Sequence, residues 1–192
     1  KFYSKSFNSI VKGKSIEIAE FSKLLENIYR SVNIGFINEM KILADKMNLD
    51  IFDVIELANT KPYGFRRFFP GPGVGGHCIP VDPSYLYWKS VKIGLPAKFI
   101  KLSADINILT LNFILKKIFK NLKNNKILLS KSNILILGLS YKKNIDDIRE
   151  SASLKLIDIL FKKGVKNISI HDPYVEDKIS GKKIKKIKFL NK

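Results

Sequence analysis

Residues 133–174 have the sequence NILILGLSYKKNIDDIRESASLKLIDILFKKGVKNISIHDPY, which contains the clearest fold signal in the chain. The apolar run at 133–137 is typical of a buried parallel strand. Residues 150–163 predict an amphipathic helix, and Gly164 suits the position just past its C-terminus. Residues 167–170 predict a second strand. A strand, a helix and a strand at this spacing predict a βαβ unit, the start of a doubly wound sheet.

Upstream of this unit the sequence predicts helices and one long loop. Four helices are predicted, at residues 16–47, 51–59, 84–93 and 96–125. Ser15 and Asp50 are suitable N-caps for the first two helices. The last helix is long enough to bridge two domains. We therefore predict an α/β multidomain fold: an all-helical domain, which the family resemblance described below makes the central one, joined by a long helix to an incomplete Rossmann-like βαβ domain. The second part is called incomplete because two strands alone do not make a stable sheet.

The composition excludes several classes of protein. Hydrophobic residues make up 45% of the chain, too many for an intrinsically disordered segment. No run of about 18 apolar residues is free of charges, so no membrane-spanning helix is expected, and the first residues do not resemble a signal peptide. The single cysteine excludes an intramolecular disulfide and a cysteine-based zinc site, and no spacing predicts a metal site. A reducing, cytoplasmic location without a membrane partner is the default expectation.

The formal net charge of +18 raises nucleic-acid binding as an alternative, non-enzymatic function. Only four of the 35 basic residues are arginines, namely Arg30, Arg66, Arg67 and Arg149, and they are scattered along the chain. Lysine is abundant together with isoleucine, asparagine and phenylalanine, as A/T-rich codons would produce. We therefore interpret the lysines as a compositional bias on solvated surfaces and predict no nucleic-acid partner. A steep salt dependence of DNA binding would favour the alternative.

The segment Pro70-Gly-Pro-Gly-Val-Gly-Gly-His-Cys-Ile-Pro-Val-Asp82 carries the strongest chemical signal. It belongs to a loop at 60–83 that holds five of the seven prolines. Its glycines let backbone N–H groups approach a ligand closely, and Cys78 follows them at once, where a nucleophilic thiol would be placed. The alternative for a lone cysteine is a small buried hydrophobe, which the neighbouring glycines argue against. His77 is adjacent to the cysteine and is expected to pack or to hydrogen-bond rather than to act as its base.

A polar stripe on the first predicted helix is a second candidate. Glu20, Lys23 and Asn27 lie three and four residues apart, which places them on one helix face. A lysine and an amide aligned there would stabilise an oxyanion and order a water molecule. The alternative is a solvated polar stripe without a chemical role.

The segment at 137–151 is a third candidate, because it follows a predicted strand and precedes a predicted helix, where α/β folds bind ligands. It lacks the full G-x-G-x-x-G pattern and is a weak dinucleotide signal. Lys142, Lys143 and Arg149 could nevertheless meet phosphate groups.

Three ordered signatures resemble the UDP-glucose/GDP-mannose dehydrogenase family. They are AEFSKLLENIYRSVNIGFINE (19–39), FFPGPGVGGHCIPVDP (68–83) and LGLSYKKNIDDIRESASLKLIDIL (137–160), followed by HDPY (171–174). The resemblance covers nearly all of residues 15–175. The form GGHCIPVDP is most similar to the branch that acts on UDP-N-acetylhexosamines such as UDP-N-acetyl-D-glucosamine. The branch of UDP-glucose 6-dehydrogenases, which usually has a different sequence around the cysteine, is the alternative.

The resemblance also implies a domain organisation. Residues 1–14 would end an NAD-binding Rossmann domain, 15–125 would form a central helical domain for dimerisation and catalysis, and 126–192 would be part of a UDP-binding Rossmann-like domain. The family's NAD fingerprint and a glutamate from its first domain are absent, so we expect a fragment that makes no NADH by itself. The lysine-rich tail at 178–192 offers no clear final element. The expected assembly is a homodimer through the central domain.

The reaction implied by the resemblance is a four-electron oxidation of a sugar C6 alcohol to a carboxylate, with two NAD⁺ reduced, for surface polysaccharide biosynthesis. Cys78 matches the nucleophile, which forms a thiohemiacetal with the intermediate aldehyde and then a thioester that water hydrolyses. Lys23 matches the lysine that stabilises developing oxyanions, and Asn27 matches its amide partner. Asp82 matches the carboxylate that helps to activate water.

Binding residues are implied in the same way. The substrate-binding set comprises Phe69, Gly71, Gly73, Val74, Gly75, Tyr141 and Lys142. Tyr141 stands where phenylalanine is common, and Arg149 matches an arginine that reaches the NAD cofactor. A competing hypothesis is a thiol hydrolase with Cys78 as nucleophile and His171 as base, which leaves the glycine-rich loop and the βαβ unit unexplained.

Overall fold

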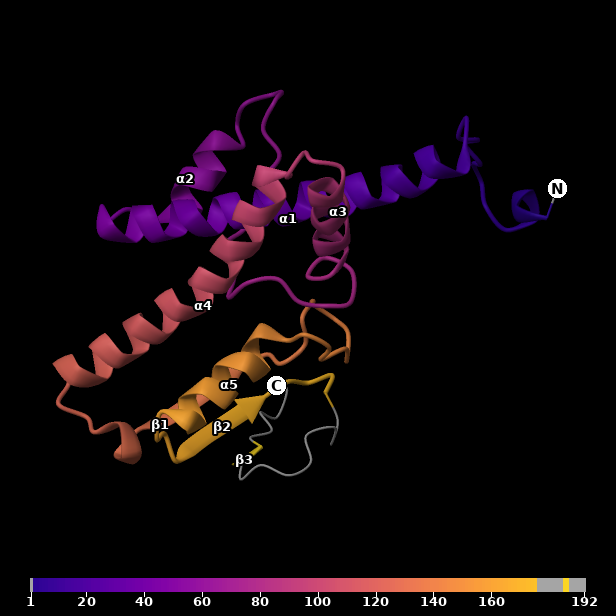
Figure 1. Cartoon of the computed structure of the whole chain (residues 1–192). Coiled ribbons are helices and arrows are strands. Elements are labelled where there is room, and N and C mark those ends of the chain that lie inside the picture. Colours follow the sequence, from indigo (N-terminus) through magenta and orange to yellow (C-terminus); the bar gives the residue numbers. More distant parts are fainter. Residues whose placement is uncertain (1, 176–184, 187–192) are drawn as a thin grey trace.

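The computed structural model describes residues 2–175 and 185–186 of the chain (Figure 1). Its helices are α1 (Ile16–Lys46), α2 (Ile51–Ala58), α3 (Asp82–Lys92), α4 (Lys98–Asn124) and α5 (Ala152–Lys162), with short 3₁₀ turns at Tyr3–Lys5 and Leu129–Lys131. Its strands are β1 (Asn133–Leu137), β2 (Asn167–His171) and β3 (Lys185–Lys186). The predicted fold class is confirmed, because a helical part is joined by the long α4 to a βαβ unit.

The first two helices begin at the N-caps that the sequence predicts. Ser15 Oγ accepts a hydrogen bond from the N–H of Ile18 at 3.3 Å, and the Asp50 carboxylate accepts one from the N–H of Phe52 at 2.8 Å. Each cap satisfies a donor that the helix itself leaves unpaired. Helix α3 begins at Asp82, earlier than predicted. The carboxylate of this residue therefore belongs to the first turn of a helix and not to the loop.

Helices α1 and α4 pack against each other and form the frame of the helical part (Figure 1). A Cβ atom added to Gly35 of α1 would lie 3.2 Å from the Cα of Ser103 in α4, so the two backbones touch at this point. Towards its C-terminal end, α1 packs on α2 through a small core of Ile37, Ile51 and Ile55. The helical part is thus organised about one close crossing of two long helices.

The strands form one parallel sheet in the order β1-β2-β3. In the first pair, Asn133 lies opposite Asn167 and Leu137 lies opposite His171. The third strand lies in the lysine-rich tail, so the expectation that this tail holds no element was wrong at Lys185–Lys186. A strand of this length has no hydrophobic period from which it could be predicted. The rest of the tail lies outside the described residues.

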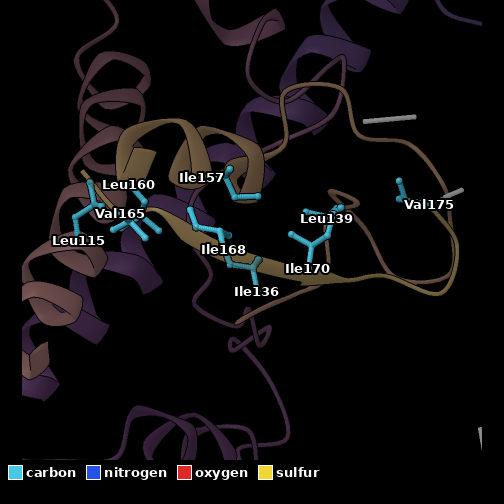
Figure 2. Close-up of a cluster of buried hydrophobic side chains, with 9 residues drawn as sticks. All are labelled: Leu115, Ile136, Leu139, Ile157, Leu160, Val165, Ile168, Ile170 and Val175. Atoms are coloured by element: carbon cyan, nitrogen blue, oxygen red, sulfur yellow. The ribbon is translucent and has the colours of Figure 1, made fainter. Parts of the chain in front are cut away.

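The main core lies between α5 and the sheet (Figure 2). It comprises Leu115, Ile136, Leu139, Ile157, Leu160, Val165, Ile168, Ile170 and Val175. Because Leu115 belongs to α4, the connecting helix is packed into both parts of the molecule. The prediction that the whole of β1 is buried was wrong, since Leu135 and Leu137 are 44% and 67% exposed. Among the described residues, the core covers only the face of β1 that carries Ile136.

Two further observations hold for residues 2–175 and 185–186. No helix there is long and apolar enough to cross a membrane. No group of three or more His, Cys, Asp or Glu side chains there is arranged to hold a metal ion.

Candidate active site

Three segments meet around the single cysteine and border a cleft of about 420 Å³. They are the first half of α1, the glycine-rich loop and the segment between β1 and α5. The predicted site residues that line the cleft are Lys23, Asn27, Gly73, Val74, Gly75, Cys78, Tyr141, Lys142 and Arg149. The third segment follows the carboxyl end of β1, the edge at which parallel sheets bind ligands. The fold therefore brings together the three groups of residues that the sequence analysis identified separately.

Cys78 lies at the end of the glycine-rich loop, just before α3. Its side chain is a free, exposed thiol, so the alternative of a small buried hydrophobe was wrong. Its carbonyl oxygen accepts hydrogen bonds from the N–H groups of Val81 at 3.1 Å and Asp82 at 2.8 Å. This turn leads directly into α3 and fixes the Asp82 carboxylate one turn beyond the thiol.

Asn27 is held by hydrogen bonds at both ends of its amide. Its Nδ2 donates to Asp82 Oδ2 at 2.6 Å, and its Oδ1 accepts from the Arg30 guanidinium at 2.6 Å. Because Asn27 is only 1% exposed, these two bonds fix the orientation of the amide. Arg30, which also lines the cleft, was not predicted as a site residue. Its spacing of three residues from Asn27 on one helix face was the available signal.

Lys23 is placed at the edge of the cleft as an exposed ion pair. Its Nζ lies 3.0 Å from Glu26 Oε2. The hydrogen bond from Lys23 and the charge of Lys23 lower the pKa of Glu26. An exposed pair of this kind contributes little free energy. The Lys23 ammonium can therefore leave Glu26 for an anionic ligand at small cost.

Tyr141 explains why two consecutive glycines are needed in the loop. A Cβ atom added to Gly75 would lie 2.7 Å from Tyr141 Cβ, and one added to Gly76 would lie 2.7 Å from Tyr141 Cε2. Gly76 also has a φ of +85°, in the left-handed region that favours glycine. Its N–H donates to the carbonyl oxygen of Arg149 at 3.0 Å. The loop is therefore joined to the segment after β1 by direct backbone contact.

The cleft is rich in positive charge, since Lys23, Arg30, Lys142 and Arg149 all line it. Arg149 is paired with Asp147, with 2.6 Å between Nη2 and Oδ2. The hydrogen bonds to Asp147 and the charge of that carboxylate raise the pKa of Arg149, and the ionised forms of Tyr141 and Cys78 act in the same direction. Such a group of cations beside a thiol suits a ligand that carries phosphates.

Phe69, Gly71 and Asp82 are predicted site residues that do not line the cleft. Asp82 takes part through its hydrogen bond to an amide that does. Phe69 stacks on Phe52, with 6.3 Å between ring centroids. The N–H of Gly71 donates a hydrogen bond to Asn38 of α1. His171, the base of the hydrolase hypothesis, ends β2 and is not among the lining residues either. This arrangement argues against a Cys78–His171 pair.

The fold and the cleft define an α/β protein that presents a thiol and several cations at the carboxyl edge of a parallel sheet. Comparison with known protein families identifies the family within this broad class. The chain belongs to the UDP-glucose/GDP-mannose dehydrogenase family: the family's central domain matches residues 17–108, and its UDP-binding domain matches residues 135–192.

Individual relatives cover most of this chain. A UDP-N-acetyl-D-mannosamine dehydrogenase of Methanococcus vannielii is 37% identical over 172 residues, 88% of this chain and 38% of the relative. A UDP-N-acetyl-D-glucosamine 6-dehydrogenase of Salmonella typhi is 36% identical over 86% of this chain and 38% of its own length. The solved structure of the UDP-D-ManNAc dehydrogenase of Pyrococcus horikoshii aligns with a TM-score of 0.75 and 39% identity, over 82% of this chain and 37% of that one. The chain thus spans less than two fifths of each of these proteins.

Proposed function

We propose that this chain supplies the substrate-binding and thiol-bearing parts of an NAD-dependent UDP-N-acetylhexosamine 6-dehydrogenase, which oxidises the sugar C6 alcohol to a carboxylate for surface polysaccharide biosynthesis. The cleft is the observation that carries the proposal. There Cys78 lies with Lys23 and Asn27 from α1, and with Lys142 and Arg149 from the segment after β1. Family membership and the names of the relatives support the substrate class.

The proposed division of labour follows the two parts of the fold. Residues 15–125 form the central helical domain, 126–192 belong to the UDP-binding domain, and 1–14 are the end of an NAD-binding domain. The matches to the family's central and UDP-binding domains fall within the first two of these ranges. Helix α4 supports the arrangement, because it packs in the helical part and also contributes to the core of the sheet.

The proposed chemistry depends on the thiol. Cys78 Sγ adds to the C6 aldehyde and forms a thiohemiacetal, while the Lys23 ammonium stabilises the oxyanion. Oxidation converts this adduct to a thioester. Asp82, held by Asn27 at 2.6 Å, then accepts a proton from the water that attacks the thioester carbon, and Cys78 leaves as a thiolate. Because a reducing compartment keeps a free nucleophilic thiol from oxidation, we place the protein in the cytoplasm.

The proposed cofactor is NAD, which when bound would supply the hydride acceptor for both oxidations at C6. Among the described residues, Arg149 fits this cofactor. Its guanidinium lines the cleft beside Cys78, and its side chain is 65% exposed. An accessible guanidinium of this kind suits the pyrophosphate of a dinucleotide.

Titration calorimetry of the chain with UDP and with UDP-N-acetylglucosamine tests the proposed substrate class. We expect both to bind and GDP to bind more weakly. Lys142→Ala should weaken the affinity for UDP about 10-fold, the effect of losing one charge-assisted contact to phosphate.

Lys143→Ala is the matched control, because Lys143 is the next residue but does not line the cleft. We expect its affinity for UDP to stay within about 2-fold of the unchanged chain. Equal losses in the two variants would mean that UDP responds only to overall positive charge. Absence of binding by the unchanged chain would contradict the proposed function.

A further inference from the structure

The close crossing of α1 and α4 places two buried amides next to each other. Gly35 lets α1 approach the backbone of Ser103 in α4. One turn further along each helix lie Asn38, which is 0% exposed, and Asn107, which is 6% exposed. Asn38 Nδ2 donates to Asn107 Oδ1 at 3.0 Å. Burying amides costs free energy unless they are hydrogen-bonded, so this pair calls for a role beyond filling space.

The amide pair holds the beginning of the glycine-rich loop. Asn38 Oδ1 accepts a hydrogen bond from the N–H of Gly71 at 2.9 Å. Asn38 is therefore an acceptor towards the loop through its Oδ1 and a donor towards α4 through its Nδ2, as the two ends of a carboxamide allow. Gly73, with a φ of +133°, packs so closely on α4 that an added Cβ would lie 3.2 Å from the carbonyl oxygen of Asn107.

The glycine-rich loop is consequently held by hydrogen bonds at its first glycine and at its last glycine. Gly71 is bonded to the amide pair, and the N–H of Gly76 donates to the Arg149 carbonyl oxygen at 3.0 Å. Cys78 follows two residues later and lines the cleft. We infer that Asn38 and Asn107 are positioning residues: through Gly71 they set the path of the loop and so the place of the Cys78 thiol in the cleft. The inference rests on the proposed function in so far as Cys78 is the nucleophile of that reaction.

Amide exchange measured by NMR and alkylation of Cys78 by iodoacetamide test this inference on the full chain. In Asn38→Leu, which keeps the branched shape of the side chain but has neither the acceptor nor the donor, the Gly71 N–H should exchange about 10-fold faster or more, as expected for the loss of a hydrogen bond. Protection of Cys78 from alkylation by saturating UDP should fall by about 5-fold or more, because the thiol leaves the cleft in a larger fraction of molecules.

Asn38→Asp is the rescue variant. Asn107 Nδ2 has no hydrogen-bond partner among the described residues, so a flip of this amide would supply a donor to the new carboxylate, which still accepts from Gly71. We expect exchange at Gly71 and protection of Cys78 within about 3-fold of the unchanged chain. If Asn38→Leu does not fold, Asn107→Ala replaces it, because it removes the acceptor of Asn38 Nδ2 and should also accelerate exchange at Gly71.

Ile37→Ala is the control for general destabilisation. Ile37 is a buried neighbour of Asn38 in α1 but packs towards α2. It should lower the melting temperature while exchange at Gly71 and protection of Cys78 stay unchanged. The inference is overturned if Asn38→Leu behaves like the unchanged chain, or if Ile37→Ala shifts both readouts equally. If UDP fails to bind the unchanged chain, the proposed function fails, while exchange at Gly71 still tests whether the amide pair holds the loop.

Discussion

The contact between Tyr141 and the glycine-rich loop shows what single residues contribute to this site. Gly75 and Gly76 leave room for the Tyr141 side chain, and Gly76 alone of the two has a left-handed φ. Gly64 offers a comparison, because it has a φ of +80° but no atom within 4 Å of an added Cβ. Backbone strain and steric overlap can therefore be separated by alanine substitutions at three glycines.

Gly64→Ala should lower the free energy of unfolding by about 1 kcal/mol, from backbone strain alone. Gly75→Ala should cost about 1 to 3 kcal/mol from overlap alone, and Gly76→Ala about 2 to 4 kcal/mol, because both effects act there. Urea denaturation measures these values. Adding Tyr141→Ala should recover part of the loss in Gly76→Ala but little in Gly75→Ala, where the overlap is with Tyr141 Cβ. A Gly76→Ala cost no larger than that of Gly64→Ala would refute the steric role of Tyr141.

At the scale of secondary-structure elements, Asp172 connects the segments that follow the carboxyl ends of β1 and β2. Its carboxylate accepts hydrogen bonds from the N–H groups of Leu139 at 2.7 Å and Ser140 at 3.0 Å, which follow β1. It also accepts from Tyr174 at 2.9 Å and Val175 at 3.2 Å, which follow β2. Burial acts to raise the pKa of Asp172, but these backbone hydrogen bonds outweigh it and lower the pKa below its ordinary value.

Asp172→Asn should therefore destabilise the sheet in a pH-dependent way. A lowered pKa in the folded state means that the carboxylate contributes its full stability above its unfolded pKa, and that this contribution is lost as the pH falls through the folded pKa. At pH 7 we expect a loss of about 1 to 2 kcal/mol, which shrinks below pH about 4. Thermal unfolding from pH 7 to 3 measures the difference. Glu39→Gln, an exposed carboxylate of α1, is the control, and a pH-independent difference at Asp172 would contradict the linkage.

At the scale of the whole molecule, the helical part leaves large apolar side chains in contact with solvent. Phe36 of α1 and Phe99, Leu102 and Leu109 of α4 are all exposed. Large apolar side chains exposed on two packed helices favour a protein interface as the surface that covers them. The net charge of +18 opposes association of two copies. Because the exposed apolar side chains favour association, we propose a homodimer through the central helical domain. Its apolar contacts would outweigh the electrostatic repulsion between the two copies.

Light scattering coupled to size-exclusion chromatography tests this assembly. We expect a dimer, and we expect salt to strengthen it because salt screens the repulsion between like-charged subunits. Leu102→Lys combined with Leu109→Lys should weaken association by about 100-fold or more. Leu128→Lys, which alters an exposed leucine beyond α4, should leave the dimer intact. A monomer at all salt concentrations would contradict the proposal.

The sequence by itself determined the helices, the caps at Ser15 and Asp50, the βαβ order and the loop that ends at Cys78. These features depend on hydrogen bonds and hydrophobic periods that act within a few residues, and such interactions are visible in a linear sequence. The exposure of Leu135 and Leu137 escaped prediction, because burial depends on whether another element covers that face of the sheet.

Only the tertiary structure decided which of these residues meet. The convergence of α1, the glycine-rich loop and the segment after β1 on one cleft depends on the packing of α4 with both parts of the fold. The hydrogen bond from Arg30 to Asn27 was missed, although their spacing of three residues on one helix was visible. The hydrogen bond from Asn38 to Asn107 could not be predicted from a helical period, because its two residues belong to different helices. A helical period identifies the residues that share a face, whereas the close approach of two backbones at Gly35 determines what that face contacts.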